Sequence, residues 1–151
     1  QLSVGLLLVP LYPESDYQDR VIAALQLLGA QRPVRRFAFG DLHLEHVRNW
    51  RLEHFGPALK ALKIEPHFPI WKIPYSDLEE TFFASGATAT VSAVTDPALA
   101  KTCSVGDRFT ADWLNLLPEG IDRFGENGEF HTLVAPPATS WRNLKSTQSV
   151  R

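Results

Sequence analysis

Short apolar runs and one helical pattern in the first forty residues limit the possible folds more than any other part of the sequence. Residues 4–9 form an apolar run that ends at Pro10 and Pro13. Such a run is typical of a strand buried on both faces. It is too short to cross a bilayer and lacks a basic leader, so we expect neither a membrane span nor a signal peptide. The run therefore predicts a parallel sheet and an α/β fold.

A helix and a second strand follow this run. Apolar residues at helical spacing predict a helix that is capped by Ser15, reaches about Leu28 and is ended by Gly29. The apolar positions expected to face the sheet are Val21, Ala24, Leu25 and Leu28. Residues 34–39 predict a second strand, which completes a βαβ unit.

The segment after the second strand lies where α/β sheets collect ligands, beyond the carboxyl ends of the strands. Asp41 is expected to cap a helix that runs to about Leu59, with Pro57 disturbing its last turn. The spacing of Asp41, Glu45 and Arg48 places them on one helical face. This pattern has two interpretations: a surface ion-pair ladder, or polar groups facing a ligand.

The second half of the chain predicts a separate small lobe. Residues 64–74 are rich in proline and aromatic residues and are interpreted as a linker. Four elements are expected beyond it: a helix over 76–85 capped by Ser76 and ended by Gly86, a strand over 89–94, a helix over 110–117 and a strand over 130–134. Residues from 136 onward are poor in apolar side chains and are expected to form a flexible tail.

Composition excludes several classes of protein. The 151 residues include 44% hydrophobic residues and four tryptophans, enough to bury a core. The net charge is -2 with both signs interleaved, so a nucleic-acid footprint is not expected. The single cysteine, Cys103, excludes an internal disulfide and suits a reducing, cytoplasmic setting; it is interpreted as a small buried hydrophobe.

The densest polar chemistry lies in residues 122–132. Gly125 and Gly128 can adopt positive φ and bring backbone close to a ligand. The remaining polar groups of this segment include Glu126, Asn127, Glu129, His131 and Thr132. In a strand, Glu129 and His131 would point to one face, where His131 could relay a proton or could instead be a structural histidine bonded to backbone. No spacing typical of a zinc site occurs, so a metal site made by protein groups alone is not expected.

Four motifs occur in order over residues 39–132: Phe39-Gly40-Asp41-Leu42 with Glu45, Arg48 and Arg51; Phe68-Pro69-Ile70-Trp71; Leu117-Pro118-Glu119-Gly120-Ile121-Asp122; and Gly125 to Thr132. Together they resemble the diphthine–ammonia ligase family of ATP pyrophosphatases, which amidates diphthine on elongation factor 2. The resemblance implies that residues 1–65 are the later part of a parallel-sheet adenine-nucleotide α-hydrolase-like (HUP) domain, and that residues 66–135 form an α+β substrate lobe.

The resemblance also implies roles for individual residues, with ATP and Mg²⁺ as cofactors, an acyl-adenylate intermediate and elongation factor 2 as the partner. Catalytic roles fall on Glu126, Glu129 and His131. Substrate binding falls on Gly125, Asn127, Gly128 and Thr132. Residue chemistry, rather than the resemblance, adds Trp71 as a hypothetical cation–π partner for the quaternary ammonium of diphthine. Nucleotide binding falls on Gly40, Asp41, Glu45 and Arg48.

Two departures from the family pattern change what is expected of this chain. The Ser-Gly-Gly-x-Asp-Ser phosphate loop is absent, so the chain alone is not expected to hydrolyse ATP. Arg123-Phe124 stands where the family carries Pro-Cys. Because the sequence contains no methionine and begins at Gln1, we expect a fragment, a processed chain or a truncated copy.

Several alternatives therefore stay open beside the ligase. They are a split enzyme whose phosphate loop lies on another segment or chain, a non-catalytic homologue that binds nucleotide or elongation factor, and a purely structural module. An exposed sheet edge would also favour homo-oligomers.

Overall fold

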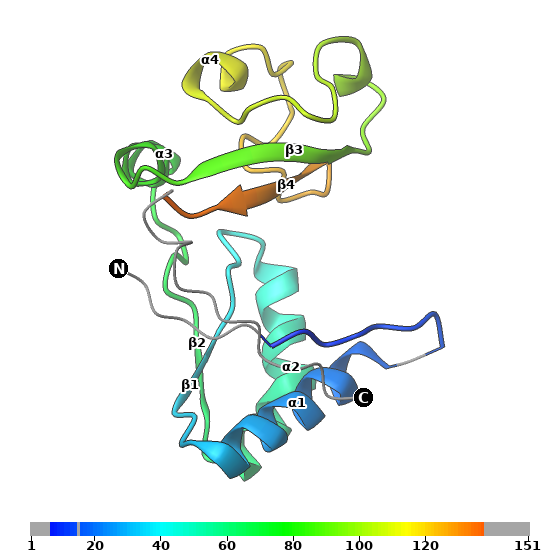
Figure 1. Ribbon diagram of the computed structural model, residues 1–151, viewed down its shortest axis with the longest axis vertical. Helices are drawn as coiled ribbons and strands as arrows, with labels where there is room; N and C mark the ends of the chain where they lie inside the picture. The colour runs from blue at the N-terminus through cyan, green and yellow to red at the C-terminus, as the bar shows by residue number, and fades with distance from the viewer. Residues whose placement is uncertain (1–6, 15, 138–151) are drawn as a thin grey trace. The chain divides into compact units, whose positions relative to one another are not determined.

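The computed structural model describes residues 7–14 and 16–137. The chain divides into two compact units, one ending at Lys72 and one beginning at Ile73. Both mix helices with strands, as Figure 1 shows. No helix within the described ranges is long and apolar enough to cross a membrane. The chain is therefore a mixed α/β protein in two units.

The N-terminal unit is built around a short parallel sheet. Its elements in order are α1 (Tyr17–Gln31), β1 (Arg36–Ala38), α2 (Glu45–Ala61) and β2 (Glu65–His67). β1 and β2 pair in parallel, with Phe37 opposite Pro66, and α2 is the crossover between them. The core of the unit consists of Leu25, Phe39, Phe55, Leu59 and Ile64. The unit thus contains a βαβ arrangement, but it begins at the second predicted strand, two elements later in the chain than the sequence predicted.

The strand expected over residues 4–9 is absent from the part of it that the structure describes, residues 7–9. Residues 4–6 lie outside the described residues, and residues 7–9 form no strand. Leu7 is 38% exposed and Leu8 is 79% exposed, so these side chains are not in a core. Within the described part of the chain, β1 and β2 pair only with each other. An apolar run without a pairing neighbour cannot satisfy its backbone groups as a buried strand.

Both helices of this unit depart from their predicted ends. α1 is capped by Asp16, whose side chain accepts a hydrogen bond from the Asp19 amide at 3.1 Å, and Ser15 lies outside the described residues. Gly29 does not end α1, which stops at Gln31 because Arg32 precedes Pro33 and takes an extended conformation. α2 begins at Glu45 with Leu44 at its N-cap, so Asp41 does not cap it.

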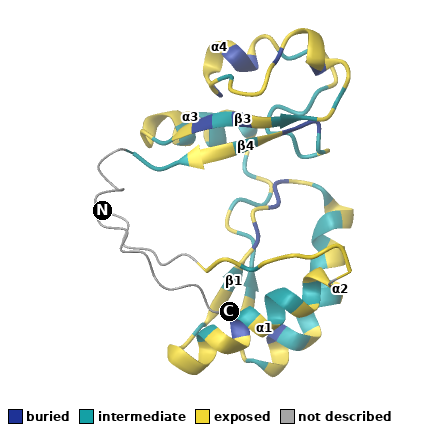
Figure 2. Cartoon of the chain, turned by 45° about the vertical axis from the view of Figure 1, so that its right-hand side comes forward, coloured by how far each residue is buried: buried dark blue, intermediate teal, exposed yellow. Residues whose placement is uncertain are grey.

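The C-terminal unit is built on an antiparallel strand pair. Its elements are α3 (Tyr75–Ala84), β3 (Thr88–Val94), a 3₁₀ turn η1 (Leu99–Lys101), α4 (Ala111–Leu114) and β4 (Phe130–Ala135). β3 and β4 pair from Thr88 opposite Ala135 to Val94 opposite Phe130, with an irregularity between Val91 and Ala93. The core consists of Ala89, Val91, Leu99, Cys103, Phe109, Trp113, Leu114 and Phe130. Figure 2 shows buried residues on both β3 and α4.

Most predictions for this unit are confirmed, with three corrections. The strands are as expected, Gly86 follows α3 at a φ of 72°, and Cys103 is buried. The segment 64–74 is not a linker, because β2 lies in it and the unit boundary falls after Lys72. α3 starts at Tyr75 after Pro74 and is not capped by Ser76.

The third correction concerns α4, which ends at Leu114. Pro118 has no amide hydrogen to donate to the Leu114 carbonyl, which accepts a hydrogen bond from Arg123 instead. The expected tail lies outside the described residues from 138 onward.

Candidate functional site

The segment between α4 and β4 forms a tight double turn, which we call the 122–129 loop. The amide of Gly125 donates to the Asp122 carbonyl at 3.1 Å, and the amide of Gly128 donates to the Gly125 carbonyl at 2.9 Å. Both glycines have positive φ, 70° and 82°. A Cβ on Gly125 would lie 2.7 Å from the Phe130 carbonyl oxygen, whereas a Cβ on Gly128 would meet nothing within 4 Å. Only glycine fits at position 125 without moving the backbone.

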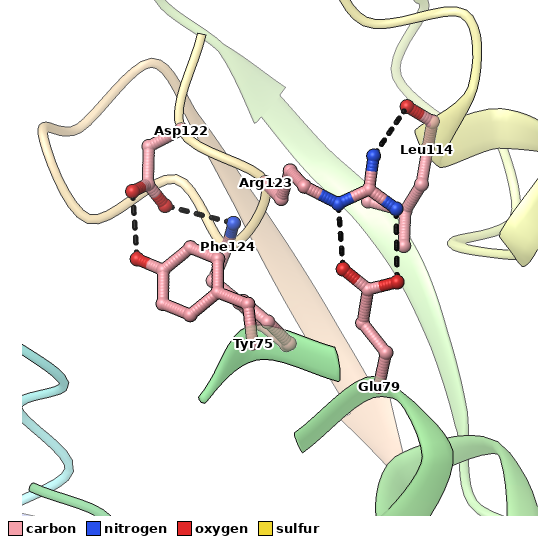
Figure 3. Close-up of polar contacts among 6 residues, drawn as sticks. All are labelled: Tyr75, Glu79, Leu114, Asp122, Arg123 and Phe124. Atoms are coloured by element: carbon pink, nitrogen blue, oxygen red, sulfur yellow. Dashed lines mark hydrogen bonds and ion pairs between the residues drawn. The ribbon is translucent and has the colours of Figure 1, made fainter. Parts of the chain in front are cut away.

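Asp122 organises the first half of this loop. Its Oδ1 accepts hydrogen bonds from the amides of Phe124 at 2.8 Å and Glu126 at 3.2 Å. Its Oδ2 accepts a hydrogen bond from the Tyr75 hydroxyl at 2.7 Å, as Figure 3 shows. One carboxylate therefore holds two loop amides and one side chain of α3.

Glu129 organises the second half from a buried position, with 7% of the residue exposed. Its Oε1 accepts from the Asp122 amide at 3.0 Å and from the Asn127 side-chain amide at 3.1 Å. Its Oε2 accepts from the Asn127 backbone amide at 3.1 Å. Burial opposes ionisation, but the hydrogen bonds from Asp122 and Asn127 and from its own amide outweigh it, and the pKa of Glu129 is lowered.

The loop is also fastened to the end of β3. The Glu129 carbonyl accepts from the amides of Thr95 at 2.9 Å and Asp96 at 3.1 Å. The Thr95 hydroxyl donates to the Gly128 carbonyl. The conformation of the loop is thus determined by its own carboxylates and by these contacts with the residues that follow β3.

An ion pair with α3 flanks the loop. Arg123 donates from Nε to Glu79 Oε1 at 2.6 Å and from Nη2 to Glu79 Oε2 at 2.8 Å. Its Nη1 donates to the Leu114 carbonyl at 3.3 Å. Figure 3 shows this fork beside the Tyr75–Asp122 bond. The hydrogen bond from Arg123 lowers the pKa of Glu79 against the effect of its burial.

Tyr75 lies in a negative environment. Burial is the largest cause that raises the pKa of its hydroxyl, followed by the hydrogen bond to Asp122 and by the charges of Asp122, Glu126 and Glu129. Tyr75 therefore remains a neutral donor to Asp122 throughout the ordinary pH range. The Phe124 ring packs edge-to-face on Tyr75 with 5.0 Å between centroids.

The remaining residues of the predicted substrate site differ in exposure. Asn127 is exposed at the tip of the loop, while Glu126 is half-buried. His131 is exposed on β4 opposite Ala93, and Thr132 is half-buried opposite Val91. The expected common face for Glu129 and His131 is wrong, because Glu129 precedes β4 and is buried whereas His131 is exposed.

The predicted nucleotide motif lies in the N-terminal unit and does not form an ion-pair ladder. Asp41 is 8% exposed and pairs with Arg51, with distances of 3.4 and 3.5 Å. Glu45 pairs with Lys72 at 2.6 Å, and that contact lowers the pKa of Glu45. Asp41 and Glu45 therefore have separate cationic partners, and Gly40 is exposed.

Arg48 takes a third kind of partner, an aromatic pair. Its guanidinium lies 5.0 Å from the Phe68 ring centre and 5.2 Å from that of Trp71. Its Nε is buried without an acceptor among the described residues. Lys72 lies 5.7 Å from the Trp71 ring as well. Trp71 thus already faces two cations of its own unit, and a ligand cation would compete with them.

These residues do not fit a magnesium nucleotide as they stand. Asp41 and Glu45 are engaged with Arg51 and Lys72, so neither carboxylate is placed to share a cation with phosphate oxygens. Across residues 7–14 and 16–137, no group of three or more His, Cys, Asp or Glu side chains is arranged to hold a metal ion.

Four residues of the site received no role from the sequence: Tyr75, Glu79, Asp122 and Arg123. Tyr75 and Glu79 are four apart on α3, which signals a shared helical face. Nothing in the sequence, however, pairs that face with Asp122 and Arg123, because these contacts span more than 40 residues.

Comparison with known proteins adds no relative. No protein-family model matches the chain, and no curated protein matches it either.

Proposed function

We propose that this chain is part of a diphthine–ammonia ligase-like enzyme and that the 122–129 loop with the start of β4 contacts the substrate. One observation carries the proposal: the residues of the Gly125–Thr132 motif lie in one preorganised loop and strand. The loop exposes Asn127 and brings backbone within reach of a ligand at Gly128. Preorganisation of this kind lowers the ordering cost of binding.

Charge supports a cationic substrate. Asp122, Glu126 and Glu129 act together on the Tyr75 hydroxyl, and each raises its pKa. The same field would attract the quaternary ammonium of diphthine. Glu126 would balance that charge, Asn127 would hydrogen-bond the substrate, and exposed His131 would carry a proton from ammonia. Glu129 would serve as a fixed acceptor that shapes the loop, because its oxygens are occupied by loop donors.

ATP and Mg²⁺ would be bound by a phosphate-loop-bearing segment or chain, and elongation factor 2 would supply the diphthine. The setting would be the cytoplasm, where Cys103 stays a thiol.

A second function, binding without chemistry, is favoured by one observation. Two carboxylates of the loop, Asp122 and Glu129, each accept three hydrogen bonds from other groups of the same unit. A loop of this kind can recognise diphthine without transferring a proton. Pyrophosphate release separates the two functions.

Calorimetric titration with an elongation factor peptide that carries diphthine tests the proposal directly. We expect saturable binding of this peptide and none of the same peptide with unmodified histidine. Asn127→Ala should weaken binding about tenfold, the loss of roughly one good hydrogen bond, whereas the exposed Asn115→Ala in the same unit should not. Equal affinity for both peptides would overturn the proposal.

Addition of ATP, ammonium and a phosphate-loop-bearing chain then distinguishes the ligase from the binding module. Release of pyrophosphate together with amide formation, followed by mass spectrometry of the peptide, supports the ligase. Binding without release supports the second function.

A further inference from the structure

α3 contacts the 122–129 loop at two points that lie on one face of the helix. Tyr75 and Glu79 are four residues apart, which places them one above the other. Tyr75 reaches Asp122 at 2.7 Å, and Glu79 takes the guanidinium of Arg123 with two contacts of 2.6 and 2.8 Å. Two adjacent loop residues are therefore held by one helix, as Figure 3 shows.

The first contact is continuous with the hydrogen bonds that shape the loop. The Asp122 carboxylate that accepts the Tyr75 hydroxyl also accepts the amides of Phe124 and Glu126. The amide of Asp122 in turn donates to Glu129, which holds Asn127. A path of direct hydrogen bonds thus runs from α3 to the exposed tip of the loop.

The second contact fixes the direction in which the chain enters the loop. Arg123 joins Glu79 of α3 to the Leu114 carbonyl at the end of α4. A planar guanidinium with a forked carboxylate allows little rotation of either group. Arg123 therefore fastens the loop to two helices at once.

We propose that α3 positions the 122–129 loop through Tyr75 and Glu79, which act as positioning residues and do not touch the ligand. The inference deepens the proposed function and rests on it only for the identity of that ligand. The loop conformation that presents Asn127 is maintained by α3 through its contacts with Asp122 and Arg123.

Hydrogen exchange of individual amides in the Tyr75→Phe variant tests the inference. This change removes the hydroxyl and keeps the ring against Phe124. We expect the amides of Phe124, Glu126 and Asn127 to exchange about tenfold faster, the effect of one lost hydrogen bond, while the amides of the β3–β4 ladder keep their rates. The affinity for the diphthine peptide should fall by a similar factor.

Matched variants separate positioning from general damage. Glu79→Gln should accelerate the same loop amides, whereas Glu80→Gln, its exposed neighbour on α3, should not. Tyr17→Phe removes a hydroxyl from the other unit and should leave loop exchange unchanged. Unchanged loop exchange in both Tyr75→Phe and Glu79→Gln would overturn the inference, as would an equal acceleration of the ladder amides. If the loop loosens while the wild-type protein binds no diphthine peptide, the proposed function fails and the positioning role stands.

Discussion

The two units bury a carboxylate to nearly the same extent and satisfy it in opposite ways. Asp41 in the N-terminal unit is 8% exposed and Glu129 in the C-terminal unit is 7% exposed. Asp41 is paired with the guanidinium of Arg51, a long side chain on α2. Glu129 is held mainly by backbone amides, those of Asp122 and Asn127. One unit neutralises the charge with another charge, and the other surrounds it with dipoles.

The difference appears in the geometry of the contacts. The Arg51 nitrogens lie 3.4 and 3.5 Å from the Asp41 oxygens, at the long end for hydrogen bonds, whereas the Glu129 contacts are 3.0 to 3.1 Å. Backbone donors have no rotamer freedom to lose, so a carboxylate that organises them specifies one loop conformation. A side-chain partner can move away and be hydrated. We infer that the C-terminal unit is the more sensitive of the two to small chemical changes.

Gly125→Ala is the strongest test of that sensitivity. The new Cβ would lie 2.7 Å from the Phe130 carbonyl oxygen, and alanine disfavours the φ of 70° found at this position. The free energy of unfolding should fall by about 3 kcal/mol, measured by urea denaturation.

Gly128→Ala is the matched control, because Gly128 has a φ of 82° but open space around its Cα. It should cost only about 1 kcal/mol, the strain of positive φ alone. Equal losses of unfolding free energy in the two variants would show that the backbone at Phe130 moves to accommodate the new Cβ. The argument for a rigid loop would then fail.

These contacts mark the limit of what the sequence could predict. The strands over 88–94 and 130–135 follow from local patterns, and so does the burial of Cys103. Gly125 and Gly128 were expected to be able to adopt positive φ because no other residue adopts it as readily, and both have it. Each of these inferences needs only neighbouring residues.

The errors in helix ends are local, such as the effect of Pro33 on the end of α1, whereas the larger errors depend on partners that are distant in sequence. The apolar run over 4–9 reads as a strand, but a strand forms only where another strand can pair with it. The spacing of Asp41, Glu45 and Arg48 was compatible with an ion-pair ladder or with polar groups facing a ligand, yet each residue has a different partner outside the set. Tyr75 and Glu79 became part of the site only through contacts made by the fold.

A pair of isosteric amide variants compares the two buried carboxylates directly. Glu129→Gln keeps the size of the side chain but places an NH₂ group where an oxygen accepted a loop amide. We expect a loss of about 2 kcal/mol in the free energy of unfolding, because a buried donor is left unsatisfied.

Asp41→Asn should cost less, about 1 kcal/mol, because Arg51 keeps 24% of its side chain exposed and can turn to water. The same urea denaturation measures both variants. A larger loss for Asp41→Asn would reverse the comparison between the units.

Acid titration gives a smaller effect with a defined sign. The pKa of Glu129 is lowered, by hydrogen bonds that outweigh its burial, and that of Glu79 is lowered by Arg123. A carboxyl with a depressed pKa stabilises the fold above its unfolded pKa of about 4.3, and this stability is lost as the pH falls further. The free energy of unfolding of the wild type should therefore decline below about pH 4.3. In Glu129→Gln the decline should be shallower, and an unchanged slope would contradict the role of this carboxylate.

The smallest effects come from the two ion pairs, which again contrast the units. Glu79 is 18% exposed in its side chain and makes a forked contact with Arg123, whereas Glu45 is 56% exposed and meets Lys72, itself 61% exposed. Glu79→Gln should lower the free energy of unfolding by about 1 kcal/mol, because one arm of a partly desolvated fork is lost.

Glu45→Gln should produce no measurable change, since a solvated pair gains little over its separate hydration. Salt sharpens the distinction: 0.5 M sodium chloride should leave the Glu79→Gln difference largely intact, because screening acts weakly on partly buried pairs. If added salt abolishes that difference, the Glu79–Arg123 fork behaves as a surface pair. The Tyr75–Asp122 hydrogen bond would then be the contact of the two that holds the loop to α3.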